Sequence, residues 1–190
     1  MSTTTEHEDP RRARSRARVL EAAVAILGED GQPGLTIEAV AARSGVAKTT
    51  IYRQFADRDE LHVAAVHSVA PTMPMPTTDD LQADVTVFCT ALNKKLQHSE
   101  FGALLATSID GGERSASLAK VLSGAGEQRR KVLADRLSAA QRDGILADDV
   151  DLDLLSSQLV GPLFYRRFLS RQPTSSAFVA EHVRSVLSRL

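Results

Sequence analysis

The chain has 190 residues, of which 43% are hydrophobic and 25% charged, a balance typical of a folded globular protein and not of a disordered one. Its single cysteine, Cys89, excludes an internal disulfide framework and favours a reducing compartment. No apolar run reaches the roughly 18 residues that a membrane-spanning helix needs, and the polar, acidic amino terminus is unlike a secretory signal peptide. We therefore expect a soluble cytoplasmic protein that does not bind membranes.

Positive charge is concentrated near the start of the chain. Residues 10–58 carry nine Lys and Arg against five Asp and Glu, a net charge of +4, although the formal charge of the whole chain is −1. Five of these arginines lie in the segment RRARSRAR at residues 11–18. A local basic excess suits an anionic partner such as nucleic acid, and the alternative is that this segment is a solvated arm.

The first 70 residues predict four helices. Apolar residues at helical spacing predict an amphipathic helix from Arg14 to about Asp30. A short helix follows after the capping residue Thr36 and ends at Gly45, which tolerates the left-handed conformation of a tight helix exit. A third helix covers residues 47–55, and a fourth begins near Asp57. Two short helices joined by a glycine-containing turn indicate a helix-turn-helix.

The rest of the chain also reads as helical. Three prolines within residues 71–78 indicate a linker, because proline removes a backbone donor and disfavours helix in the residue before it. We expect later helices over 81–97, over 100–110 with an end at Gly111 and Gly112, over 115–122, over 127–142, from Asp151 or Asp153 to about 170, and over 176–190. No strand or hairpin pattern competes, so the predicted fold class is all-α.

The third helix presents a chemically distinctive outer face. A wheel of 100° per residue centred on Ile51 directs Ile51 and Phe55 towards the core. The side chains directed outward or obliquely can donate to guanine, pair with adenine, contact the thymine methyl or hold phosphate oxygens. They are Lys48, Thr49, Thr50, Tyr52, Arg53 and Gln54. This face is either a DNA-reading surface or an ordinary solvated helix face.

The segment TIEAVAARSGVAKTTIYRQFADRDEL at residues 36–61 resembles the helix-turn-helix of TetR-family transcriptional regulators. The matching features are a capping threonine, a small residue in the second helix, a Gly-Val turn, a tyrosine with a following aromatic residue, and a charged helix start. These features are Thr36, Ala41, Gly45, Val46, Tyr52, Phe55, Asp57 and Arg58. The later segments DGILADDVDLDLL and LVGPLFYRRFL resemble, more loosely, a C-terminal domain type of the same family.

The resemblance implies a dimeric, sequence-specific DNA-binding transcriptional regulator, a repressor released from a palindromic operator in double-stranded DNA by a small-molecule effector. The residues expected to contact DNA are Thr36, Lys48, Thr49, Thr50, Tyr52, Arg53, Gln54 and Arg58, with Thr36 and Arg58 as phosphate clamps. Two positions depart from the family pattern. Arg58 stands where a lysine is usual, and Glu38 would repel phosphate if it faced the DNA backbone.

The residues and the resemblance together indicate four regions. These are a flexible basic arm (1–13), a helix-turn-helix DNA-binding domain (14–70), a proline-rich linker (71–78) and a helical effector-binding and dimerisation domain (79–190). Homodimers of this family pair their last two helices. An apolar stripe on the last helix is compatible with that role, although it can equally be core within one chain. The stripe consists of Phe178, Val179, His182, Val183, Val186 and Leu187. Pro162 lies inside the helix that precedes the last one and should kink that helix.

The family binds its effector between the linker and the dimer interface. Aromatic and leucine side chains in this region would line an apolar cavity, which favours a mainly apolar effector, and the alternative is a filled core. They are Phe88, Leu92, Phe101, Leu104, Leu105, Phe164, Tyr165 and Phe168. The alternative is a DNA-binding regulator whose C-terminal domain binds a protein partner and not a small molecule.

The residues give no indication of catalysis, of a metal site or of a cofactor. The five histidines are scattered, with no pair at i, i+4 and no cysteine partners. The acidic run at residues 148–153 lacks the glycine and the terminal glutamate of a calcium loop, so a helix cap is the better interpretation. We therefore expect a protein that is not an enzyme.

Overall fold

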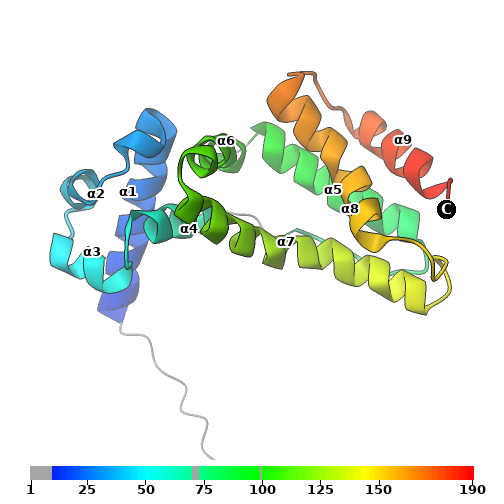
Figure 1. Ribbon diagram of the computed structural model, residues 1–190, viewed down its shortest axis with the longest axis horizontal. Helices are drawn as coiled ribbons and strands as arrows, with labels where there is room; N and C mark the ends of the chain where they lie inside the picture. Colours follow the sequence, from blue (N-terminus) through cyan, green and yellow to red (C-terminus); the bar gives the residue numbers. More distant parts are fainter. Residues whose placement is uncertain (1–9, 70–72, 99) are drawn as a thin grey trace, which may run out of the picture. The chain divides into compact units, whose positions relative to one another are not determined.

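The computed structural model describes residues 10–69, 73–98 and 100–190, which form helices joined by turns without any strand in these ranges (Figure 1). The all-α prediction is confirmed. In chain order the elements are α1 (Pro10–Gly34), α2 (Ile37–Ser44), α3 (Lys48–Gln54), α4 (Arg58–Ser68), α5 (Leu81–His98), α6 (Glu100–Arg114), α7 (Ala116–Arg142), α8 (Leu152–Phe164), the π-helical turn η1 (Tyr165–Leu169) and α9 (Ser176–Leu187).

The chain forms two compact units. The first contains the described part of Met1–Ala70 together with Leu104–Leu122, and the second contains the described part of Pro71–Ala103 together with Ser123–Leu190. Helices α6 and α7 therefore each contribute residues to both units. Residues 1–9 of the expected arm and residues 71 and 72 of the expected linker lie outside the described ranges. Within those ranges, no helix combines the length and apolarity that crossing a bilayer requires.

In the first unit, α1 packs against α2, α3 and α4. The core between them includes the fully buried side chains Val19, Ala23, Leu35, Val40, Ile51 and Leu61. Two predicted helix starts are confirmed by their caps. The Thr36 hydroxyl accepts a hydrogen bond from the Ala39 amide at 3.1 Å, and the Asp57 carboxylate accepts one from the Glu60 amide at 2.8 Å.

Helix α1 begins at Pro10, four residues earlier than the apolar pattern predicts. Proline suits the first turn of a helix because its missing N–H has no intrahelical acceptor there, and arginine has high helix propensity. The arginine-rich segment therefore lies within the helix and does not precede it. Gly31, with φ of 69° and ψ of −168°, interrupts the helical geometry close to the predicted end at Asp30.

Two predicted helix ends are wrong. Helix α6 continues through Gly111 and Gly112 to Arg114, and α7 is one continuous helix where two were expected. At Gly111 the reason is packing, because a Cβ atom there would lie 2.8 Å from Leu118 Cδ2. The glycine permits this close approach at a helix-propensity cost of about 1 kcal/mol, which tertiary contacts can offset.

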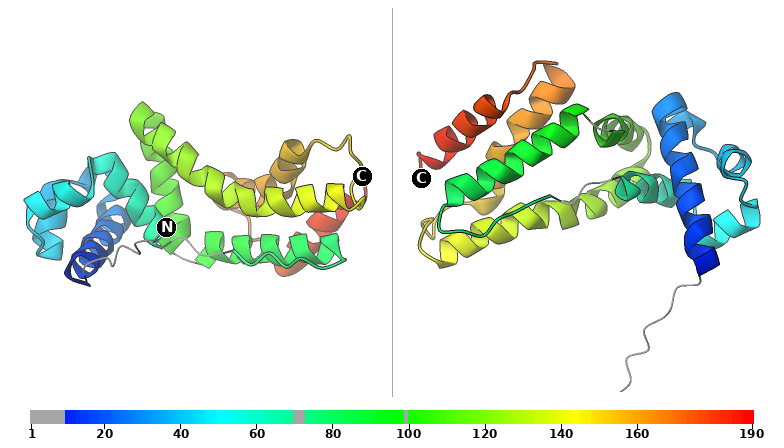
Figure 2. Two further views of the ribbon diagram at one scale, coloured as in Figure 1. Left: turned by 90° about the horizontal axis from the view of Figure 1, so that it is seen from below. Right: turned by 180° about the vertical axis from the view of Figure 1, so that it is seen from behind.

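The second unit is a bundle in which α5 contacts both α8 and α9, and the carboxyl-terminal part of α7 runs alongside α5 (Figure 2). A buried ion pair joins α7 to α5, with Arg136 Nε 2.8 Å from Asp84 Oδ2. Thr78 completes this cluster, since its amide and hydroxyl donate to Asp84 and its carbonyl accepts from Arg136. Burial raises the pKa of Asp84, but the hydrogen bonds from Thr78 and Arg136 outweigh it and hold that pKa below the usual range.

Candidate nucleic-acid interface

The turn between α2 and α3 is held by both backbone and side-chain contacts. Gly45 ends α2 in the left-handed region, with φ of 65°. The Ser44 hydroxyl accepts from the Val46 amide at 3.2 Å, and Arg18 of α1 donates to the Ser44 carbonyl. Val46 is buried. These contacts fix the angle at which α3 leaves the turn, and α2 and α3 lie on the same side of α1 (Figures 1 and 2).

Helix α3 has one buried and one exposed face. Ile51 and Phe55 are almost fully buried, and Thr49 and Arg53 on the opposite face are exposed. Tyr52 is 55% exposed, a high value for a large aromatic side chain, and Thr50 is half-buried. The predicted orientation of these residues is confirmed. An exposed tyrosine, threonine and arginine on one short helix can supply both base-edge and phosphate contacts.

Gln54 does not face outward, which corrects the prediction for this residue. Its side chain is buried, and its amide Nε2 donates to the Ser15 hydroxyl at 2.7 Å. Arg16 donates to the Gln54 carbonyl at 3.5 Å, and its guanidinium lies 4.6 Å from the centre of the Phe55 ring. The start of α1 therefore positions the end of α3. Gln54 stands three residues after the buried Ile51, so the helical period already placed both on one side.

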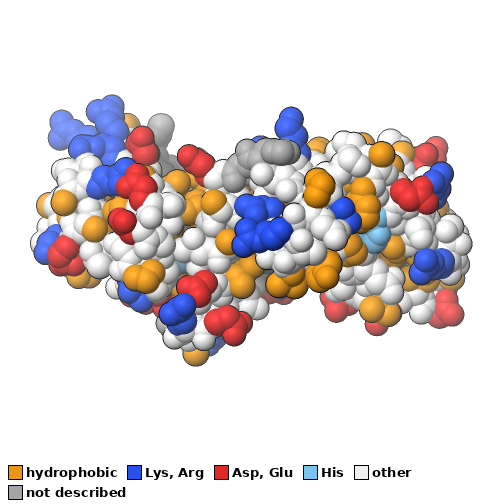
Figure 3. All heavy atoms as spheres, turned by 90° about the horizontal axis from the view of Figure 1, so that it is seen from above, with side chains coloured by type: hydrophobic (Ala, Val, Ile, Leu, Met, Phe, Trp, Pro, Cys, Tyr) orange, Lys and Arg blue, Asp and Glu red, His pale blue; other side chains and the backbone are white. Residues whose placement is uncertain are grey.

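Lys48 is exposed but paired with an acidic residue. Its ammonium lies 2.6 Å from a carboxylate oxygen of Glu38 on α2, and this hydrogen bond lowers the pKa of Glu38. Glu29 and Arg43 form a second pair through two hydrogen bonds of 2.5 and 2.7 Å. Figure 3 shows Lys and Arg side chains close to Asp and Glu side chains at the left, amino-terminal end of the view. The ion pair with Lys48 weakens the expected repulsion between Glu38 and phosphate. The same pair weakens the attraction of Lys48 for phosphate.

Thr36 and Arg58 lie at the amino-terminal ends of α2 and α4. Thr36 is the N-cap of α2, so its oxygen accepts from Ala39 while the hydroxyl hydrogen can still donate. Arg58 is the exposed first residue of α4. Backbone N–H groups without intrahelical acceptors point out of both ends, and such ends attract anions.

The residues expected to bind an effector are divided between the two units. Leu104 and Leu105 belong to the first unit, and the other six belong to the second. Phe88, Phe101 and Leu104 are buried, whereas Leu92, Leu105, Phe164 and Phe168 are half-buried. Tyr165 is 57% exposed, so it is not enclosed within the single chain.

Two residues expected at the dimer interface belong instead to the core of their own chain. Val179 and Val183 are fully buried where α9 packs on α5 and α8. A residue without exposed surface cannot contact a partner, which corrects the prediction for both. The other members of the predicted stripe, namely Phe178, His182, Val186 and Leu187, are half-buried.

The described residues contain no group of three His, Cys, Asp or Glu side chains placed to hold a metal ion. Cys89 is buried in the second unit, and burial raises the pKa of its thiol to about 12. A thiol in this environment stays protonated and unreactive.

Two family models match the chain, and together they cover most of it. The model for bacterial regulatory proteins of the tetR family matches residues 19–65, and the model for the tetracyclin repressor-like C-terminal domain matches residues 75–186. The first match contains the whole helix-turn-helix, and the second contains most of the helical bundle.

Individual relatives agree with these matches. The chain is 26% identical over 176 residues to the uncharacterized HTH-type transcriptional regulator YdeS of Bacillus subtilis (strain 168), covering 92% of this chain and 88% of that protein. The solved structure of the TetR family transcription regulator SCO0332 is 32% identical with a TM-score of 0.75, covering 93% of this chain and 98% of its own. The flavonoid-responsive regulator FrrA shares the fold at 21% identity and a TM-score of 0.73, covering 93% and 95%.

Proposed function

Because the chain belongs to the TetR family of DNA-binding transcriptional regulators, we propose that it is a cytoplasmic homodimer that binds a palindromic operator through α3. It represses transcription until a small, mainly apolar effector releases it from that operator. The observation that carries the proposal is the exposed Thr49, Tyr52 and Arg53, opposite the buried Ile51 on a helix whose entry and exit are both fixed.

The exposed residues divide into two roles. Arg53 and Thr49 project farthest from the core and contact base edges in the major groove, with Thr50 beside them. Tyr52, Lys48, Thr36 and Arg58 hold phosphates on either side and set the register of the helix without reading sequence. Gln54 positions α3 from inside the unit and does not contact DNA.

Exposed apolar residues of the second unit support the dimer. Leu154, Tyr165 and Leu169 are 56%, 57% and 74% exposed, and their spacing of eleven and four residues places them on one side of α8 and η1. Large apolar side chains in a row are unfavourable in water, and a second copy of the chain would cover them in a symmetric interface. The partly exposed Phe178, Val186 and Leu187 of α9 belong to the same interface.

The effector proposal rests on the aromatic side chains of the second unit. Buried Phe88 and half-buried Phe164 and Phe168 provide apolar lining, with the Phe164 and Phe168 ring centres 6.1 Å apart. The fold accommodates ligands with long apolar parts in other proteins, since the regulator FadR of Bacillus subtilis, 13% identical with a TM-score of 0.66, is solved in complex with stearoyl-CoA. Effector binding would shift the two DNA-reading units of the dimer away from the spacing of successive major grooves.

Selection of bound sequences from random duplex DNA by the purified chain tests the proposal. We expect a palindromic motif whose half-sites repeat at about one helical turn or a multiple of it, bound by two chains per duplex in sedimentation analysis. Failure of a folded protein to enrich any motif would contradict sequence-specific DNA binding. Enrichment of a single half-site bound by one chain would contradict the dimer alone.

A further inference from the structure

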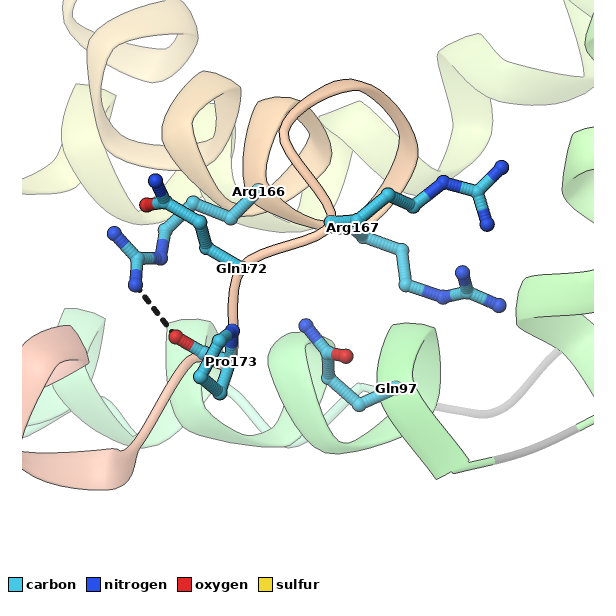
Figure 4. Close-up of a pocket in the computed structure, with 6 residues that line it drawn as sticks. Gln97, Arg166, Arg167, Gln172 and Pro173 are labelled. Carbon is cyan, nitrogen blue, oxygen red and sulfur yellow. Dashed lines mark hydrogen bonds between the residues drawn. The ribbon is translucent and has the colours of Figure 1, made fainter.

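A cavity of about 250 Å³ lies in the second unit, between the end of α5 on one side and η1 with the segment that follows it on the other (Figure 4). Three arginines, two glutamines and a proline line it: Gln97, Arg166, Arg167, Arg171, Gln172 and Pro173. None of these six residues is acidic. This lining differs from the apolar cavity that the aromatic residues predict, and it calls for a separate explanation.

The two consecutive arginines are anchored by neutral groups. Arg166 donates to the Pro173 carbonyl at 2.5 Å, and its guanidinium lies 4.2 Å from the centre of the Phe178 ring. Arg167 donates through Nε to the Leu96 carbonyl at 2.7 Å. Figure 4 shows Arg166 directed towards Pro173 and Arg167 extending in the opposite direction. These contacts orient the guanidinium groups but do not neutralise their charge, and each group keeps further N–H donors.

Arg171 adds a third cation in an unusual backbone conformation. Its φ of 54° is positive, as at no other non-glycine residue within the described ranges, and its side chain is exposed. Residues with a Cβ atom seldom adopt a positive φ, and such backbone conformations are concentrated at ligand-binding sites. The left-handed residue closes the turn between η1 and α9 and brings its guanidinium to the same cavity as Arg167.

We propose that this cavity binds a small oxyanion, either a carboxylate or a phosphate. Guanidinium groups present a planar fork of donors that matches the oxygens of both anions, and a cluster of arginines without an acidic neighbour in the lining attracts them electrostatically. The volume lies below the roughly 300–1,000 Å³ of pockets that enclose drug-sized ligands, so the ligand is a small acid or the acidic end of a larger molecule. This site goes beyond the apolar effector proposed above and does not depend on DNA binding.

Isothermal titration of the full chain with inorganic phosphate, and separately with succinate, tests the proposal at constant ionic strength with chloride as the balancing anion. We expect saturable binding of one anion per chain, and the probe that binds more tightly identifies the class. Arg171→Gly removes the guanidinium while retaining the backbone conformation, so binding should weaken at least tenfold. Arg171→Lys retains the charge without the fork and should weaken it less.

Arg142→Ala, at an exposed position of α7 outside the cavity, is the matched control and should bind like the wild-type chain. Arg171→Asn also tolerates the left-handed region and is a second neutral variant should the glycine variant fold poorly. The proposal is overturned if neither anion binds saturably to the wild-type chain. It is also overturned if Arg142→Ala weakens binding as much as Arg171→Gly, since that would indicate diffuse charge attraction and not a site.

Discussion

His182 of α9 donates a hydrogen bond from Nε2 to the carbonyl oxygen of Gln158 in α8, at 3.1 Å. The intrahelical donor for that carbonyl would be the amide of residue 162, which is proline and has no N–H. The same nitrogen lies 3.2 Å from the Leu159 carbonyl. The terminal helix is therefore hydrogen-bonded to α8 at the point where proline leaves a backbone acceptor unpaired.

The loss in free energy of unfolding on replacing His182 should depend on whether residue 162 is proline. We expect His182→Ala to lower the free energy of unfolding by at most about 1 kcal/mol, because the solvent-exposed Gln158 carbonyl loses its donor and water replaces it only in part. In a Pro162→Ala background the amide of residue 162 can supply that donor, so the same change should cost clearly less. Urea denaturation of the four proteins gives the coupling energy. Equal costs in the two backgrounds would show that the Gln158 carbonyl left unpaired by Pro162 is not the source of the lost stability.

The buried pair of Arg136 and Asp84 should be among the most sensitive positions of the second unit. Arg136→Met leaves the Asp84 carboxylate buried without its cation, so we expect a loss of about 3–5 kcal/mol in urea denaturation. Adding Asp84→Leu removes the unpaired charge and should recover most of that loss. If the double variant is no more stable than Arg136→Met, the charge is not the source of the cost.

His62 should make the stability of the chain depend on pH. Its Nε2 donates to the Ser108 hydroxyl at 2.8 Å, Ser108 donates onward to the Leu104 carbonyl, and Nδ1 has no partner among the described residues. Burial lowers the pKa of His62 to about 4, against about 6.5 in an unfolded chain. Between these values the unfolded chain binds more protons, so stability falls as the pH falls through this window.

We expect the wild-type chain to lose about 2–3 kcal/mol more than His62→Gln when the free energy of unfolding is measured at pH 7 and again at pH 4.5. Glutamine retains a donor for Ser108 but does not titrate, and the comparison cancels the contribution of the carboxylates common to both proteins. Parallel pH profiles for the two proteins would contradict this assignment.

Glu38 should limit the affinity for DNA. Glu38→Gln releases Lys48 from its ion pair and removes a negative charge beside the DNA-reading helix, so binding should tighten about 3–10-fold at low salt. The slope of log affinity against log salt should steepen by about one, because one more cation is available to phosphate. Fluorescence anisotropy with labelled duplexes measures both quantities.

Asp135→Asn is the matched control, since it releases Lys131 from a similar pair on α7 in the second unit. It should leave the DNA affinity and its salt slope unchanged. If both substitutions tighten binding equally, overall charge and not the position of Lys48 determines the effect.

Three helix starts were predictable because their signals are local. Thr36, Asp57 and Asp151 each cap a helix that begins at the following residue, and a capping side chain bonds only to amides within three residues. The exposed and buried faces of α3 were predictable for the same reason, since they follow from the helical period around Ile51. Gln54 is the exception, because the contacts with Ser15 and Arg16 of α1 that cover it come from residues distant in sequence.

Features that depend on distant residues were not predictable. From sequence alone, Gly111 predicts a helix end. Only the close packing of the Leu118 side chain against Gly111 explains why a glycine lies inside α6. The sequence likewise gives no sign that α6 and α7 contribute to both compact units, and it leaves open whether Val183 packs against its own chain or against a second copy. The arginine-lined cavity depends on the π-helical turn and on the left-handed Arg171, neither of which has a reliable sequence signal.

The most direct test of the central claim compares Arg53→Ala with the wild-type chain on the selected operator and on a scrambled duplex of equal length. If Arg53 reads a base, operator affinity should fall about 10–100-fold, in line with roughly 1–3 kcal/mol per specific contact, while affinity for the scrambled duplex changes little. Arg142→Ala should change neither affinity, and all three proteins should melt at the same temperature because both arginines are exposed. An Arg53→Ala protein that is folded and retains the full operator preference would contradict sequence reading by α3.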